Sequence, residues 1–223
     1  MERSIKFLRE VGLVVRKAPK GTLGDAFLPG IKIVDGELHV DTQRAAVTDI
    51  LHDAGHLATI PTYFRFKANG DLSGVQKEMI AYLDSHMNDL ATYPECEFSR
   101  ALLQCGETEA IAWQYAASQA IGLPDELLFP PQTAKEIKEN GSWEDTLEGL
   151  KRNDYLGING LQCAGWTQVR PNRYMADKGI PVYPKLAYWL KDVPNPYSAA
   201  QHDALAKDPG QAGEMPKMRT LRP

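Results

Sequence analysis

The chain has 223 residues, a net charge of −4 and a hydrophobic content of 43%, which is enough to build one sizeable core. Acidic and basic residues are mixed along the chain, so no basic patch points to a nucleic-acid partner. No apolar run approaches the roughly 20 residues that a membrane-spanning helix needs. We therefore expect a globular protein with neither a nucleic-acid nor a membrane partner.

The N-terminus and the cysteines bear on the cellular compartment. The first ten residues alternate charged and apolar side chains and lack the continuous apolar segment of a signal peptide. The three cysteines, Cys96, Cys105 and Cys163, are odd in number and unclustered, which favours free, buried thiols in a reducing environment over a disulfide framework. Both features predict a cytoplasmic protein.

In chain order, the first predicted elements are a short helix, a hairpin and a longer helix. Apolar spacing over residues 4–15 predicts an amphipathic helix, which the proline and glycines that follow it end. Residues 27–41 alternate apolar and polar side chains around Asp35-Gly36, a pattern typical of a β-hairpin. Asp41 or Thr42 can then cap a helix that runs to about residue 58.

The rest of the chain is mainly helical by the same criteria. Apolar periodicity predicts helices, or in the last case one or two helical turns, over residues 75–90, 98–121, 134–139, 143–151 and 183–190. The glycine-flanked segment 157–160 is interpreted as a turn.

Large apolar side chains become rare from residue 194 onward, which is typical of a flexible tail. The predicted fold class is α+β, with a helix-dominated single domain over 1–193 that contains a small hairpin, followed by a flexible tail over 194–223.

The segment His52-Asp53-Ala54-Gly55-His56 carries the clearest chemical signal. It lies within an apolar run, and residues i and i+4 of a helix share one face about one turn apart. Two neutral imidazoles placed in this way can bind one zinc ion from the same side, as in the motif His-Glu-x-x-His. Asp53 occupies the position of the motif's glutamate. The alternative is a pair of structural histidines, whose buried nitrogens would need hydrogen-bond partners.

A catalytic zinc site needs a third protein ligand and keeps one position open for water. The segment from Gly106 to Trp113 begins a second apolar stretch and carries Glu107 and Glu109. Residues two apart on a helix point about 200° away from each other, so one carboxylate can reach the metal while the other faces elsewhere. The alternative is that both are acids favoured by a helix N-terminus.

A hairpin, a helix with His-x-x-x-His and a second apolar helix with a glutamate together resemble the Glu-ligand branch of the zincin metallopeptidases. Residues 27–33, 52–58 and 107–116 are more closely similar to uncharacterised bacterial zincin-like proteins with a His-Glu-Ala-Gly-His-type motif. The later segments Tyr155-Leu-Gly and Leu161-Gln-x-Ala-Gly also resemble the C-terminal part of those proteins.

The resemblance implies a zincin-like fold in which Zn²⁺ is bound by His52, His56 and Glu107, with Glu109 as the alternative third ligand. It also implies hydrolysis of a peptide or amide bond in a peptide or small-molecule substrate, by a water activated between the metal and Asp53. Aspartate is one methylene shorter than glutamate, so its carboxylate lies about 1.5 Å farther back. Misplacement on this scale can lower a rate about 100-fold, which leaves a weak hydrolase, a hydrolase of another substrate and a non-catalytic binding protein as alternatives.

Residues 50–56 are also similar to the Leu-Leu-His-Asp-Ile-Gly-His signature of HD-domain phosphohydrolases. That resemblance implies His52 and Asp53 as adjacent metal ligands, joined by an upstream histidine and a distal aspartate. The upstream histidine is His39, which lies in a segment that alternates like a strand, whereas that fold is all-helical. The candidates for the distal aspartate are Asp84, Asp89 and Asp125. We favour the zincin-like interpretation because the order of the elements fits it better.

Overall fold

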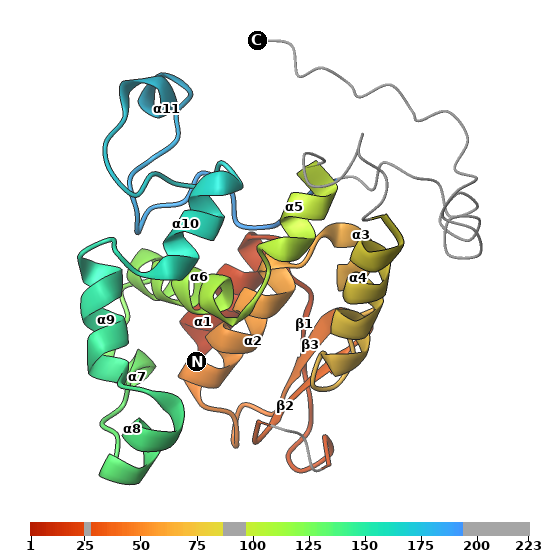
Figure 1. The fold of residues 1–223 in the computed structure, drawn as a ribbon. Helices are drawn as coiled ribbons and strands as arrows, with labels where there is room; N and C mark the ends of the chain where they lie inside the picture. Colours follow the sequence, from red (N-terminus) through yellow and green to blue (C-terminus); the bar gives the residue numbers. More distant parts are fainter. Residues whose placement is uncertain (25–27, 87–96, 194–223) are drawn as a thin grey trace.

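The computed structural model of the protein describes residues 1–24, 28–86 and 97–193 (Figure 1). The elements in chain order are α1 (Glu2–Glu10), β1 (Val15–Lys17), β2 (Ile31–Val34), β3 (Glu37–Val40), α2 (Val47–Thr59), α3 (Thr62–Arg65), α4 (Ser73–His86), α5 (Glu97–Leu103), α6 (Glu107–Ala120), α7 (Asp125–Leu128), α8 (Ala134–Asn140), α9 (Trp143–Lys151), α10 (Leu156–Cys163) and α11 (Arg173–Asp177). The predicted tail over 194–223 lies outside the described residues.

A three-stranded sheet with the order β1-β3-β2 packs against helix α2 (Figure 1). The predicted hairpin is present as the antiparallel pair of β2 and β3. Asp35 and Gly36 connect the strands with φ angles of 48° and 76°, as a mirror-image hairpin turn requires. Alternation along the two strands buries four side chains, Ile31, Ile33, Leu38 and Val40. The parallel pairing of β1 with β3 was not predicted.

Helix α1 is shorter than the helix predicted over residues 4–15, because a Schellman motif ends it at Glu10. Gly12 adopts a φ of +99°, and its N–H donates to the carbonyl of Arg9. The N–H of Leu13 donates to the carbonyl of Leu8. The chain then continues as extended backbone into β1, and β-branched valines favour that conformation.

Helices α2 and α6 cross at the centre of the molecule and form its most extensive interface (Figure 1). Buried side chains from Ile5 to Tyr183 form one core around this crossing. Trp113 of α6 is fully buried, and its indole N–H donates to the carbonyl of Trp189 over 3.0 Å. The predicted helix-dominated α+β class is confirmed. None of the described helices combines the length and the apolar character that crossing a bilayer requires.

Helix α2 begins at Val47, later than the predicted start, and no side chain caps it. The Asp41 carboxylate accepts hydrogen bonds from the backbone N–H groups of Gly21 and Gln43. These two bonds lower the pKa of Asp41. Asp41 therefore fixes the loop between the sheet and α2 and does not cap the helix.

The other end of α2 is held by Arg65, whose buried guanidinium donates to the carbonyls of Leu57 and Ile60 over 2.6 and 3.0 Å. The same group donates to the carbonyl of Lys191 over 3.1 Å, which ties the C-terminal part of the described chain to the helix. A cation at a helix C-terminus also interacts favourably with the helix dipole.

Three predictions for residues 98–190 are wrong. The helix predicted over 98–121 is two helices, α5 and α6, because the chain turns at Gly106, the N-cap of α6. Residues 157–160 lie inside α10 and form no turn. Residues 183–190 form no helix; there the N–H of Ala187 donates to the carbonyl of Trp166.

The remaining helix predictions agree with the structure. Those over 134–139 and 143–151 correspond to α8 and α9, and that over 75–90 corresponds to α4, although residues 87–90 lie outside the described residues. The thiol predictions are partly right, because Cys105 and Cys163 are both free but Cys163 is exposed. Cys96 lies outside the described residues.

Candidate metal centre

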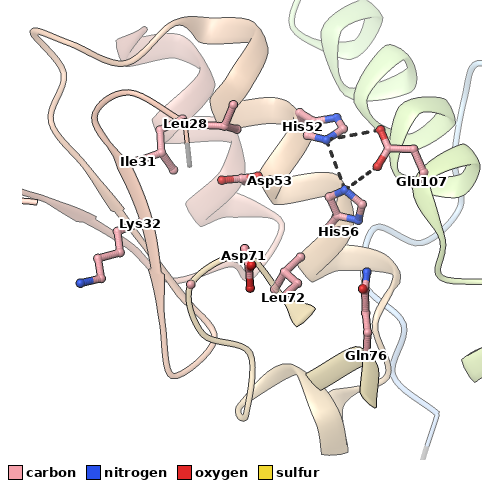
Figure 2. A pocket seen from close by; sticks show the side chains of 11 residues that line it. Leu28, Ile31, Lys32, His52, Asp53, His56, Asp71, Leu72, Gln76 and Glu107 are labelled. Carbon is pink, nitrogen blue, oxygen red and sulfur yellow. Dashed lines mark hydrogen bonds and ion pairs between the residues drawn. The ribbon is translucent and has the colours of Figure 1, made fainter. Parts of the chain in front are cut away.

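Three predicted ligand side chains converge where α2 crosses the start of α6 (Figure 2). The Nε2 atoms of His52 and His56 are 3.2 Å apart. The Glu107 carboxylate faces both, with Oε1 3.5 Å from Nε2 of His52 and Oε2 3.0 Å from Nε2 of His56. Among the described residues this is the group of three or more His, Cys, Asp or Glu side chains that could hold a metal ion.

The local sequence explains why the three side chains meet. The i,i+4 spacing places both imidazoles on the face of α2 that looks toward α6. Gly55 lies between them, and a Cβ there would be only 2.5 Å from the carbonyl oxygen of Ala110 in α6. The missing side chain lets the two helices approach closely, and this brings Glu107, in the first turn of α6, within reach of the histidines.

The spacing of the three donors fits a zinc ion. Ligands in a tetrahedral zinc site lie about 2.0–2.1 Å from the metal, which puts neighbouring donor atoms about 3.3 Å apart, close to the 3.0–3.5 Å seen here. Two Nε2 atoms that face each other can share at most one proton favourably, whereas a shared cation satisfies both lone pairs. Two imidazoles and one carboxylate are also a recurrent donor set for catalytic zinc.

The protonation states favour metal binding too. Burial lowers the pKa of His52, which promotes its neutral form. The hydrogen bond with His56 is the largest cause of the lowered pKa of Glu107, which promotes the carboxylate. These are the forms in which imidazole and carboxyl groups bind metals. The side chains of His52 and Glu107 remain 26% and 59% exposed, so the group is open to solvent on one side.

Glu109, the alternative third ligand, points elsewhere. Its Oε2 accepts hydrogen bonds from the N–H of Gly106 over 3.1 Å and from the hydroxyl of Thr108 over 3.0 Å. Glu109 is 9% exposed, and α10 covers it at Gly160, where any Cβ would overlap the Glu109 side chain. Glu109 therefore caps the first turn of α6, and Glu107 is the glutamate that faces the imidazoles.

Asp53, the predicted general base, lines the same cleft as the two histidines. Its carboxylate projects from α2 toward Leu28 and Ile31 and not toward Glu107 (Figure 2). Burial raises the pKa of Asp53 to about 6, and the charges of neighbouring acids add to this effect. A carboxyl group with that pKa is ionised at neutral pH and is a stronger base than an ordinary aspartate.

The described residues do not assemble the ligand set that the phosphohydrolase resemblance implies. His39 lies on β3, with its Nε2 3.7 Å from Oε2 of Glu37, and neither His39 nor Asp53 belongs to the group that could hold a metal. Of the distal candidates, Asp125 pairs with Lys151 over 2.9 Å, Asp84 is exposed on α4, and Asp89 lies outside the described residues.

Two clefts border the group of His52, His56 and Glu107 and share three lining residues, Leu28, His52 and Glu107. We call the first, of about 470 Å³, the Asp53 cleft; it also contains Lys32, Asp53 and Asp71. The second, of about 530 Å³, is called the aromatic cleft; its distinguishing side chains are Asp49, Phe129, Trp143 and Tyr155. Two clefts therefore adjoin the group of His52, His56 and Glu107.

Sequence reasoning did not find the side chains of the aromatic cleft. They come from α2, from α9, from the residue that follows α7 and from the residue that precedes α10, and no local pattern links positions so far apart. It also missed Gln114, which interacts with His52 through its side chain and donates to the backbone carbonyl of Thr48 over 2.9 Å. Second-layer contacts of this kind orient ligating histidines in metal sites.

No family model, no curated protein and no solved structure matches the chain. The function is therefore argued from the geometry of the site.

Proposed function

We propose that the protein is a zinc-dependent hydrolase of zincin type that acts on a peptide or amide bond. The observation that carries this proposal is the convergence of His52, His56 and Glu107 on one point between two open clefts. Three ligands with an open side are typical of catalytic zinc, whereas structural zinc sites are closed by four. The donors and distances support zinc, and the two adjoining clefts support a chain-like substrate.

Zinc held by these ligands would supply a Lewis acid that polarises the scissile carbonyl and lowers the pKa of a water molecule nearby. The chain supplies the rest. Gln114 orients His52, and the close crossing at Gly55 holds Glu107 in place. We expect the carboxylate of Asp53 to turn from Leu28 and Ile31 toward the ligands, where it would accept the proton of the attacking water and return it to the leaving amine. Because its reach is about 1.5 Å shorter than that of glutamate, we expect slow turnover.

The first experiment measures the metal content of protein purified without added metal, by elemental analysis. We expect about one zinc per chain in the wild type and in Asp53→Asn, and a loss of zinc in His52→Ala and Glu107→Ala. His39→Ala is the matched control, because it removes an imidazole on β3 and should leave the zinc content unchanged. Absence of metal from the wild type, together with no uptake of added zinc, would overturn the proposal.

The second experiment measures hydrolysis of a mixture of fluorescence-quenched peptides by the zinc-loaded protein. We expect slow cleavage that Asp53→Asn abolishes and that Asp53→Glu raises, because the longer side chain restores the reach of the base. A zinc-loaded wild type without activity, and no gain in Asp53→Glu, would favour a non-catalytic zinc-binding protein.

A further inference from the structure

The aromatic cleft is continuous with the ligands and has its own chemistry. It shares His52 and Glu107 with the metal centre, so a group bound there would lie next to the scissile bond of the proposed substrate. The rings of Phe129 and Trp143 are 5.9 Å apart between centroids and inclined at 45°, and Tyr155 adds a third ring to the lining. Such walls accept an apolar group or the apolar stem of a longer side chain.

The charged side chains of the aromatic cleft limit which substrate side chains it can bind. The lining contains the carboxylate of Asp49 but no lysine or arginine. Within the described parts of the chain, the electrostatic neighbours of the Asp49 carboxylate are His52 and Asp53, and no salt bridge joins Asp49 to a cation. With zinc bound by Glu107 and two neutral imidazoles, the metal centre would carry one net positive charge. Asp49 would then be the acid of this lining that does not bind the metal.

An aromatic or aliphatic occupant would bury Asp49 without a partner, and leaving a carboxylate desolvated is unfavourable. A basic side chain avoids this cost. Its stem can lie against the rings of Phe129 and Trp143 while its cation interacts both with ring faces and with the carboxylate. The Asp53 cleft differs, because it contains Lys32, which would repel a basic group, beside the acids Asp53 and Asp71.

We propose that the aromatic cleft selects a substrate residue with an arginine or lysine side chain, held between the rings of Phe129 and Trp143 and the carboxylate of Asp49. This inference rests on the proposed hydrolytic function, because it names the substrate class of the same site.

The test uses paired quenched heptapeptides of alanine and leucine that carry one arginine, placed in turn at each position, and counterparts with citrulline. Citrulline has nearly the same shape as arginine but no charge. For the preferred position we expect kcat/KM of the zinc-loaded wild type to be at least about tenfold higher for arginine. Asp49→Asn should bring the ratio of kcat/KM for arginine to kcat/KM for citrulline close to one, and Trp143→Ala should lower this ratio. Asp145→Asn is the matched control, because it removes an exposed acid of α9 that does not line the cleft.

Binding separates this inference from the proposed function. Fluorescence anisotropy of labelled arginine and citrulline peptides is measured on zinc-loaded Asp53→Asn and on the same protein with Asp49→Asn added. One outcome is that the arginine peptide binds more tightly, that Asp49→Asn removes this difference, and that the wild type cleaves neither peptide. This outcome would retain the cleft assignment and reject the hydrolase. Equal cleavage and equal binding of both peptides at every position would overturn the cleft assignment while leaving the hydrolase intact.

Discussion

The close crossing of α2 and α6 predicts a double defect in Gly55→Ala. The added Cβ would lie 2.5 Å from the carbonyl oxygen of Ala110, whereas carbon and carbonyl oxygen normally stay about 3.3 Å apart. The helices must therefore separate by about 0.8 Å at this point. Overpacking of this kind costs about 1–3 kcal/mol, and the better helix propensity of alanine offsets at most about 1 kcal/mol.

The same shift should weaken zinc binding, because Glu107 lies three residues before Ala110 on the displaced helix. A metal site tolerates ligand displacements of about 0.2 Å, so we expect zinc affinity to fall at least about tenfold. The assays are urea unfolding of the metal-free protein and competition for zinc with a chromophoric chelator.

Gly74→Ala is the matched control for this change. Gly74 lies in the first turn of α4, where a Cβ would meet no atom within 4 Å. We expect this variant to bind zinc as the wild type does and to be slightly more stable. Wild-type stability and wild-type zinc affinity in Gly55→Ala would refute the idea that the glycine sets the position of Glu107.

Three further predictions concern the same region. Glu109→Ala should destabilise the protein by about 1 kcal/mol because it removes the cap of α6, while zinc stoichiometry stays unchanged. Glu107→Ala should lose zinc and keep the stability of the metal-free protein. Loss of zinc in Glu109→Ala would contradict the assignment of Glu107 as the third ligand. In the metal-free protein, burial raises the pKa of Asp53 from an ordinary 3.8 to about 6, so the folded state favours the neutral carboxyl group. The stability that this preference contributes is complete below pH 3.8 and is lost as the pH rises through about 6. Asp53→Asn should therefore be more stable than the wild type at pH 8, by up to about 3 kcal/mol, and not at pH 3.5, as pH-dependent chemical unfolding can establish. Removal of zinc with a chelator should lower the midpoint of thermal unfolding, since free zinc at 100 times its Kd contributes about 2.7 kcal/mol; an unchanged midpoint would argue against binding to the folded state.

Local patterns predicted the parts of the fold that local chemistry determines. The alternation around Asp35-Gly36 specified the hairpin, and the spacing of His52 and His56 placed both on one helical face. Strand β1 has three residues and pairs with β3, more than twenty positions away, so its short sequence contains no signal for that partner.

The error at residues 157–160 comes from tertiary packing. Gly157 and Gly160 indicate a turn by local propensity, yet both lie in α10, where a Cβ at either would overlap the start of α6. Tertiary packing there overrides the low helix propensity of glycine. The choice between Glu107 and Glu109 depended on the same packing, because the start of α6 at Gly106 determines which carboxylate faces α2.

The first turn of α6 is enclosed by glycine contacts from two helices, with Gly55 of α2 on one side and Gly157 and Gly160 of α10 on the other. Such a turn has little freedom, so the three donors stand at their mutual distances before any ion arrives. Metal uptake would then require no folding step, in contrast to zinc fingers, whose apo forms are unfolded. The rate of entry would depend on the ion's loss of hydration water, and exchange of one metal for another would leave the backbone unchanged.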